Sequence, residues 1–283
     1  MIVTGKSKLL GVIGYPIEHS LSPKMHNAAL EYLALNYVYL PFLVSPENLK
    51  RAIEGFEAIS LVGFSVTIPH KQTIIPLLNH VSPIAKAVRA VNTVAWSSQG
   101  WQGTNTDVAG FISPLLSLSK NWTDIKPLVL GSGGAARAVI VGLAEIGCRS
   151  VDVVGRQLEK LKFLQTSLNE AALDIEIHIH NWNQREHLIT KTTLLINTTP
   201  LGMEPHTELS PIEEKFWNNI PPDLIAYDLI YTPSPTLFLQ QAADHGAKTI
   251  DGKDMLIEQG AAAFNIWLGQ DAPVEVMRKA MYG

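Results

Sequence analysis

The sequence predicts an α/β protein with two α/β domains, one of which holds a doubly wound parallel sheet. Apolar segments of strand character alternate with helix-prone segments along most of the chain. One of these strands leads into a glycine cluster and then into a helix, an arrangement typical of doubly wound sheets. The length of 283 residues is also that expected for about two domains.

Composition narrows the class of protein. Apolar residues make up 46% of the chain, enough for a sizeable core, and the net charge of -4 gives no basic surface for nucleic acid. The single cysteine, Cys148, excludes an intrachain disulfide and is typical of a reducing compartment. No secretory signal is visible, and no apolar stretch approaches the length of a membrane span. We therefore expect a cytoplasmic protein without a membrane or nucleic-acid partner.

The N-terminal half alternates strands and helices. We expect strands at residues 9–14, 37–44, 61–68 and 92–96, a hairpin return at 101–103, and helices at 22–35, 46–56 and 82–91. Ser22 and Ser82 are expected to be N-caps, because each precedes a proline at the first helical position. Asp107 is expected to cap the helix that follows it.

Polar side chains follow two of these strands, at the point where open α/β sheets bind ligands. Ser20 and Ser22 lie at a loop–helix junction whose dipole attracts an anion such as a carboxylate. Capping alone accounts for Ser22 but leaves Ser20 unexplained. Thr67 and Lys71 lie at the end of a strand stopped by Pro69, so we expect them to face a crevice. A solvated loop lysine is the alternative interpretation of Lys71.

The segment Gly131-Ser132-Gly133-Gly134-Ala135-Ala136 follows the apolar run 127–130 and fits a Rossmann-type dinucleotide-binding turn. Gly131 permits the tight turn, and Gly133 lets the backbone approach the phosphates. Ala136 is small enough for the helix to pack closely on the strand. An ordinary tight turn between a strand and a helix is the alternative.

The strand expected at residues 150–155 indicates which dinucleotide binds. In NAD-binding domains an acidic residue near the end of this strand holds the ribose 2′-hydroxyl. Here Asp152 lies too early, and Arg156 follows the strand with no carboxylate before Glu159. A guanidinium suits a 2′-phosphate, so the pattern favours NADP over NAD. A surface arginine is the alternative.

The rest of the chain continues the alternation. Strands are expected at residues 175–180, 193–197 and 224–231, and helices at 135–146, 158–171, 235–245, 254–268 and 273–281. His178 and His180 share one face of the first of these strands, but no third ligand is evident. We therefore expect an edge strand there and no metal site.

Several short motifs occur in a fixed order. They are Gly14-Tyr15-Pro16 through His19-Ser20-Leu21-Ser22-Pro23 and His26-Asn27, Ser65-Val66-Thr67-Ile68-Pro69-His70-Lys71, Ala90-Val91-Asn92-Thr93, Asn105-Thr106-Asp107, Gly131 to Ala136, Asn197-Thr198-Thr199-Pro200-Leu201-Gly202-Met203, and Asp251-Gly252 with Met255-Leu256-Ile257-Glu258-Gln259. In order and spacing they resemble the shikimate dehydrogenase family over essentially the whole chain. The resemblance implies an oxidoreductase that converts shikimate to 3-dehydroshikimate reversibly with NADP, a step towards chorismate and the aromatic amino acids. A homodimer is compatible with it.

The resemblance also implies roles for individual residues. Lys71 and Asp107 resemble the catalytic pair, and Ser20 and Ser22 the hydroxyls that bind the substrate carboxylate. Further substrate contacts are implied for Thr67, Asn92, Tyr231 and Gln259. Cofactor contacts are implied for Gly131, Ser132, Gly133, Gly134, Ala135, Ala136, Arg156, Thr198, Leu229 and Gly252.

The implied site requires a discontinuous domain. The C-terminal helices must return to the first domain if Gln259 is to reach Lys71 and Asp107. We therefore expect a substrate domain of residues 1–107 plus 250–283, an NADP-binding domain of residues 108–249, and an active site in the cleft between them.

The residue types suit the implied chemistry. Oxidation of a secondary alcohol removes a hydride and a hydroxyl proton, and without a metal a side chain must handle the proton. A lysine base would need to lose its proton near neutrality, whereas a neighbouring carboxylate favours the ammonium. We expect a coupled pair in which Asp107 orients Lys71 and binds the substrate hydroxyl, with the position of the proton within the pair left open.

The sequence departs from the usual family pattern at a few positions. Ser65 stands where the family usually has Asn. The alternative is therefore a quinate/shikimate dehydrogenase with dual substrate use or with use of NAD. Gly155 and Gln157 flank Arg156, so a hydroxyl partner for the phosphate is lost. Asp254 replaces a glycine and is expected to cap the last long helix. A sensor that binds both ligands without catalysis is a further alternative, against which the retention of Lys71 and Asp107 argues.

Overall fold

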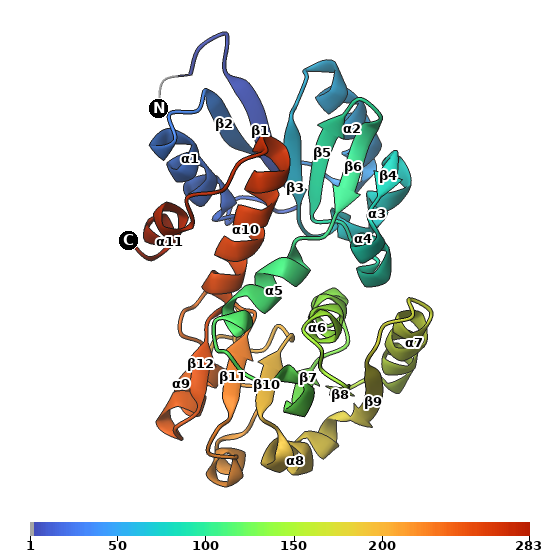
Figure 1. Ribbon diagram of the computed structural model, residues 1–283, viewed down its shortest axis with the longest axis vertical. Coiled ribbons are helices and arrows are strands. Elements are labelled where there is room, and N and C mark those ends of the chain that lie inside the picture. Colours follow the sequence, from blue (N-terminus) through green and yellow to red (C-terminus); the bar gives the residue numbers. More distant parts are fainter. Residues whose placement is uncertain (1–2) are drawn as a thin grey trace. The chain divides into compact units, whose positions relative to one another are not determined.

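The computed structural model describes residues 3–283, which group into two compact units. One unit is formed by the chain up to Gly110 together with Ile257–Gly283, and the other by Phe111–Leu256. The divisions fall within two helices, α5 (Asp107–Leu116) and α10 (Gly252–Leu268). Each unit has its own six-stranded sheet with helices packed on it (Figure 1). The predicted fold class of two α/β domains is confirmed.

The sheet of the first unit has the strand order β2-β1-β3-β5-β6-β4. Its strands are β1 (Lys8–Gly14), β2 (Tyr37–Leu43), β3 (Gly63–Val66), β4 (His80–Val81), β5 (Thr93–Ser97) and β6 (Gly100–Thr104). β1 is parallel to both β2 and β3, while β5 is antiparallel to β3 and to β6. The carboxyl ends of β1, β3 and β6 and the amino end of β5 therefore meet at one edge of the sheet.

The helices of this unit pack on the sheet and on one another. They are α1 (Ser22–Tyr32), α2 (Leu49–Ala58), α3 (His70–Thr73), α4 (Pro83–Val88) and α11 (Val274–Tyr282), joined by the part of α10 from Ile257 onward. Ile13, Phe64 and Val94 of three neighbouring strands pack against Ile53 and Phe56 of α2. Removal of these side chains from water fixes the sheet as a rigid base for the loops at its edge.

The sheet of the second unit is entirely parallel, in the order β12-β11-β10-β7-β8-β9. Its strands are β7 (Pro127–Leu130), β8 (Ser150–Gly155), β9 (Glu176–Asn181), β10 (Leu194–Asn197), β11 (Ile225–Asp228) and β12 (Lys248–Ile250). Its helices are α6 (Gly134–Glu145), α7 (Leu158–Asn169), α8 (Arg185–Leu188) and α9 (Leu237–Asp244), besides the remaining parts of α5 and α10. The chain builds outward from β7 in one direction and then from β10 in the other. This is the doubly wound order, with its switch point between β7 and β10.

Several local predictions need correction. Ser82 caps α4 as predicted, accepting a hydrogen bond from Ala85 N at 3.2 Å. The prediction that Ser22 is an N-cap is wrong, because α1 begins at Ser22 itself, preceded by Leu21, and no side chain caps it. The helix expected at 82–91 ends at Val88, where Arg89 takes a left-handed φ of 56°.

Some strands are shorter than the apolar runs that predict them, because a strand ends where its hydrogen bonds to the neighbouring strand end. The strands expected at residues 61–68 and 224–231 are only β3 and β11, and β12 was not predicted. Asp251 rather than Asp254 caps α10, since its Oδ1 accepts from Lys253 N at 2.7 Å.

Candidate active site

Lys71 and Asp107 form an ion pair at the site edge of the first sheet. Lys71 lies in α3, shortly after β3, and Asp107 is the first residue of α5, shortly after β6. Lys71 Nζ donates to Asp107 Oδ2 at 2.6 Å, and the two side chains are 31% and 18% exposed. The Asp107 carboxylate therefore accepts hydrogen bonds from side chains and does not cap α5, as the sequence predicted it would. The pair is fixed yet still accessible.

Asn92 connects this pair to its surroundings. The residue is buried at the amino end of β5, and its Nδ2 donates to Asp107 Oδ1 at 2.8 Å and to Thr106 Oγ1 at 3.0 Å. Its Oδ1 accepts from Thr106 N at 2.7 Å. Each Asp107 oxygen thus has its own partner, Lys71 on one side and Asn92 on the other. An acceptor-only carboxylate held in this way keeps the ammonium in place.

Gln259 reaches the same cluster from a distant part of the chain. Its Oε1 lies 3.4 Å from Asn92 Nδ2. Trp267 of the same helix donates its indole N–H to Val94 O at 2.9 Å. At Gly260, α10 approaches α1 so closely that a Cβ would overlap the Met25 methyl group. These contacts hold this part of α10 on the first sheet.

Ser20, Ser22 and Thr67 follow the carboxyl ends of two paired strands. β1 and β3 are in register at Ile13 and Val66, and Thr67 N donates to Ile13 O at 3.0 Å. Ser22 is buried, and Ser20 and Thr67 are half-buried. The strand order therefore brings the predicted substrate-binding residues of the first unit to the edge that holds the Lys71–Asp107 pair.

The predicted cofactor residues gather at the switch point of the second sheet. Gly131 has a φ of +117°, and a Cβ there would meet Thr198 Oγ1 at 2.6 Å. Thr198, which follows β10, donates its hydroxyl to Leu130 O at 2.7 Å. The loops after β7 and β10 are thus in contact, and Gly131 is required by the fold itself.

Gly133 and Gly134 have a different reason to be glycine. A Cβ at either position would meet no atom within 4 Å, and Gly133, Gly134 and Ala135 are exposed. The bare backbone leaves open space beside the first N–H groups of α6, which suits a pyrophosphate. Ala136 is fully buried, so α6 packs closely on the sheet. The loop fits the dinucleotide that the sequence predicts.

The other predicted cofactor contacts lie at the same edge of this sheet. Arg156 is exposed and directly follows β8, which pairs with β7. Gly252 lies against the segment after β11, since a Cβ there would meet Leu229 O at 2.6 Å. Tyr231 belongs to that segment too, and burial raises the pKa of its phenol. The role of Tyr231 in binding substrate stays a prediction.

A buried carboxylate that the sequence did not single out ties these loops together. Asp228 Oδ2 accepts from Thr236 Oγ1 at 2.6 Å, and Oδ1 accepts from Asn197 Nδ2 at 3.1 Å and from Ile230 N at 3.0 Å. Burial raises the pKa of Asp228 to about 6, while these hydrogen bonds act in the opposite direction. The only signal in the sequence was a polar residue within an apolar run.

Two further residues near the substrate edge were missed. Thr106 was part of a recognised motif but was given no role, although it holds both polar atoms of Asn92. Tyr39 of β2 donates its phenol to Ser65 Oγ at 2.9 Å. Nothing in the apolar strand around Tyr39 distinguishes it in the sequence.

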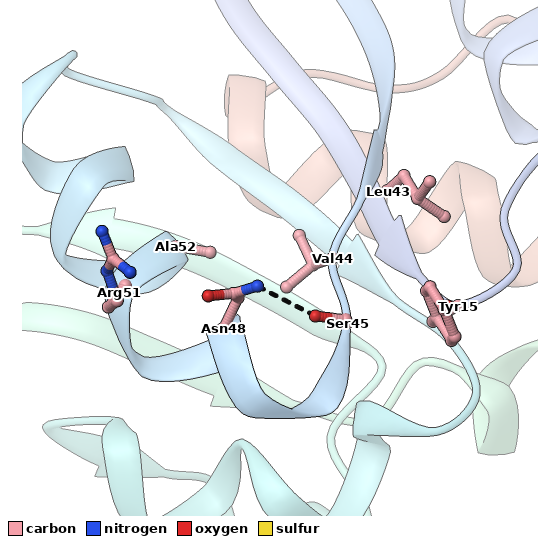
Figure 2. A pocket seen from close by; sticks show the side chains of 7 residues that line it. All are labelled: Tyr15, Leu43, Val44, Ser45, Asn48, Arg51 and Ala52. Atoms are coloured by element: carbon pink, nitrogen blue, oxygen red, sulfur yellow. Dashed lines mark hydrogen bonds between the residues drawn. The ribbon is translucent and has the colours of Figure 1, made fainter.

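An open hollow of about 520 Å³ lies at the carboxyl ends of β1 and β2 in the first unit (Figure 2). It is lined by Tyr15, Leu43, Val44, Ser45, Asn48, Arg51 and Ala52. Within it Asn48 Nδ2 donates to Ser45 Oγ at 3.0 Å, as Figure 2 shows. Its lining includes none of the predicted site residues and no pair of acid and base groups, so we assign the chemistry to the Lys71–Asp107 pair instead.

The histidines of β9 do not gather metal ligands. β9 is the edge strand, as predicted, and His180 Nε2 lies 2.6 Å from Asp152 Oδ1. Within residues 3–283, no three His, Cys, Asp or Glu side chains are arranged to hold a metal ion. In the same range, no helix has the length and apolar character needed to cross a membrane.

Comparison with known proteins places the chain in one family. Residues 12–94 match the model of the shikimate dehydrogenase substrate binding domain, and residues 252–282 that of the shikimate 5′-dehydrogenase C-terminal domain. The shikimate dehydrogenase (NADP(+)) of Crocosphaera subtropica is 53% identical over 99% of this chain and 97% of its own length. Shikimate dehydrogenase from Aquifex aeolicus has a TM-score of 0.90 and 38% identity over 100% of both chains. The Thermus thermophilus enzyme, in complex with NADP(H) and shikimate, has a TM-score of 0.85 and 32% identity over 97% of this chain and 98% of its own. The chain belongs to the shikimate dehydrogenase family.

Proposed function

We propose that this protein catalyses the reversible NADP-dependent oxidation of shikimate to 3-dehydroshikimate, with Lys71 and Asp107 handling the hydroxyl proton. The observation that carries the proposal is the fixed Lys71–Asp107 pair, 2.6 Å apart, on the sheet edge reached by Ser20, Ser22 and Gln259. The family relationship supports the substrate and the cofactor. An enzyme of this activity serves the biosynthesis of chorismate and the aromatic amino acids.

The residues of the first unit bind and orient the substrate. Ser20 and Ser22 donate to its carboxylate, while Thr67, Asn92 and Gln259 contact its hydroxyls. Asp107 accepts a hydrogen bond from the reacting hydroxyl, and Lys71 lies beside it to exchange the proton. Asn92 keeps Asp107 Oδ1 occupied, so that Oδ2 stays aligned with the ammonium.

The residues of the second unit hold the cofactor. The exposed backbone at Gly133 and Gly134 receives the pyrophosphate, and Arg156 binds the 2′-phosphate. Ser132, Thr198, Leu229 and Gly252 supply the remaining contacts. When bound, NADP would supply the acceptor for the hydride that leaves the substrate carbon. The substrate domain of residues 1–107 plus 250–283, the NADP domain of residues 108–249, the cleft between them, the cytoplasmic location and a homodimer stay predictions.

The direct test is NADPH formation from shikimate by the purified protein. We expect a higher kcat/KM for shikimate than for quinate, and for NADP than for NAD. Comparable values for quinate and NAD would instead favour an enzyme of dual specificity. Binding of NADPH and shikimate without any turnover would favour a sensor.

Arg156→Ala tests the cofactor assignment. We expect kcat/KM for NADP to fall by roughly 10- to 100-fold while the value for NAD changes little, because a hydrogen bond to a charged group contributes about 1.5–3 kcal/mol. Arg149→Ala is the matched control, since Arg149 is also exposed but precedes β8 instead of following it. An equal loss with both cofactors would remove Arg156 from 2′-phosphate recognition.

A further inference from the structure

The hydroxyl groups of Ser22, Tyr39 and Ser65 lie close together near the start of α1, and we call this row the hydroxyl chain. The phenol of Tyr39 donates to Ser65 Oγ at 2.9 Å. The Ser22 hydroxyl lies beside the same phenol and acts to lower its pKa, as a hydroxyl that donates towards the phenol oxygen does. Tyr39 is 0% exposed, and Ser22 and Ser65 are each 8% exposed, so water does not compete freely for these groups.

The Tyr39 ring is fixed relative to Ser22 by residues of the helix that Ser22 begins. The His26 ring stacks on it, with centroids 4.3 Å apart and planes within 16°. The Asn27 side chain forms two hydrogen bonds with the Tyr39 backbone, from Nδ2 to the carbonyl and from the amide N–H to Oδ1, both of 2.9 Å. The phenol can therefore rotate its proton but cannot move away.

The hydroxyl chain and the imidazole stacked on it carry no charge near neutral pH. Burial lowers the pKa of His26 to about 3, so its imidazole is neutral. Burial raises the pKa of Tyr39, so its phenol keeps its proton. The three hydroxyls consequently hold three protons, and each oxygen can donate one hydrogen bond and accept others.

We propose that Tyr39 is a positioning residue for carboxylate recognition, acting through the chain Ser65–Tyr39–Ser22 to direct the Ser22 proton towards the substrate. This inference rests on the proposed function, in which Ser22 binds the substrate carboxylate. Without an anion, Ser22 donates to Tyr39 and Tyr39 donates to Ser65. With a carboxylate present, Ser65 donates to Tyr39, Tyr39 donates to Ser22, and Ser22 donates to the carboxylate. Only O–H rotations are needed, and each oxygen keeps its own proton.

This arrangement gives Ser65 a specific role. When Tyr39 turns its proton towards Ser22, its oxygen accepts a hydrogen bond, and Ser65 is placed to donate it. A hydroxyl can reverse from acceptor to donor by rotation, which an apolar side chain cannot do. Ser65 thus completes the hydroxyl chain.

Tyr39→Phe tests the proposal because it removes only the phenol oxygen and keeps the ring stacked on His26. We expect KM for shikimate to rise roughly tenfold with kcat changed by less than about twofold, in line with the loss of one hydrogen bond to a charged group. KM for shikimate methyl ester, which lacks the anion, should change little. Tyr37→Phe, on the same strand but outside the chain, is the matched control and should leave both values unchanged.

Ser65→Ala supplies a second variant that leaves Tyr39 in place, should Tyr39→Phe fail to fold. It should shift the ratio of the two KM values in the same direction. The double variant should be no worse than Tyr39→Phe, because the chain is already broken. Normal shikimate turnover with an unchanged KM ratio in these variants would overturn this inference and leave the proposed function intact. Absence of shikimate turnover in the unaltered protein would overturn both.

Discussion

Lys71 owes its proposed chemistry to its neighbours rather than to its residue type, since most lysines are solvated. Its ammonium donates to Asp107 at 2.6 Å, and Asp107 in turn accepts from Asn92 at 2.8 Å. A group that transfers a proton must be held within hydrogen-bond reach of the reacting hydroxyl. Asn92 and Asp107 meet that requirement by fixing the end of a flexible side chain.

Lys71→Ala is expected to lower kcat by about 10³-fold and to change KM for shikimate far less, because acid–base catalysis contributes roughly 10²- to 10⁴-fold. Steady-state kinetics measures both constants. Lys86→Ala, which truncates an exposed lysine of α4, should leave both unchanged. A near-normal kcat in Lys71→Ala would exclude Lys71 from the catalytic pair.

At the scale of elements, the turn between β7 and α6 contains glycines with opposite reasons for being there. Gly131 is required by the fold, because a side chain would collide with Thr198. Gly133 has an ordinary φ of -89° and open space around it, so its lack of a side chain serves what binds there. Substitution can therefore separate stability from cofactor binding within one turn.

Gly133→Ala is expected to leave the Tm unchanged and to raise KM for NADP by about tenfold or more, because a methyl group keeps the pyrophosphate from the α6 N–H groups. Thermal unfolding and steady-state kinetics provide the two readouts. Gly55→Ala on α2, where a Cβ likewise meets no atom within 4 Å, controls for the added methyl group. An unaltered KM for NADP would mean that this turn does not hold the pyrophosphate.

Asp228, at the end of β11, makes the stability of the second unit depend on pH. Its pKa is about 6 in the folded protein against an ordinary 3.8, so folding favours the protonated form. The associated stability is fully present below pH 3.8 and is lost as the pH rises through about 6. The shift corresponds to a contribution of this one group to the free energy of unfolding on the order of 3 kcal/mol.

Asp228→Asn should therefore gain stability relative to the unaltered protein as the pH rises from about 4 to 7, by up to roughly 3 kcal/mol, since the amide cannot ionise. Urea unfolding at a series of pH values measures the difference. A pH-independent difference for Asp228→Asn would contradict the raised pKa.

At the scale of the whole molecule, each unit has its own sheet and its own apolar core. In the second unit, Leu128, Leu195 and Ala226 of three strands pack with Trp217 and Phe238. This unit is one continuous stretch, Phe111–Leu256, whereas the first unit is assembled from two separate stretches. We therefore expect the second unit, rather than the first, to fold when it is produced on its own.

A fragment of residues 111–256 is expected to unfold cooperatively and to bind NADPH, because its sheet, core and glycine turn are all contained within it. Circular dichroism during heating and NADPH fluorescence test the two properties. The same fragment with Gly133→Ala should fold equally well and bind more weakly. A fragment without a cooperative transition would show that its core depends on residues outside it.

The sequence by itself determined the features that depend on neighbours along the chain. The glycine turn, Arg156 after its strand, the capping by Ser82 and the order of motifs are all local, and they sufficed to predict two α/β domains and the family. Local patterns carry this information because turn geometry and helix starts are set by a few consecutive residues.

Only the tertiary structure decided how the site is assembled. Asn92 bonds Asp107 and reaches Gln259 because β5 runs antiparallel to β3 and α10 returns to the first sheet. For the same reason Asp107 binds Lys71 instead of capping its helix, and Ser22 faces Tyr39 instead of capping α1. Strand order and direction set these contacts between distant residues, and no propensity of the individual segments encodes them.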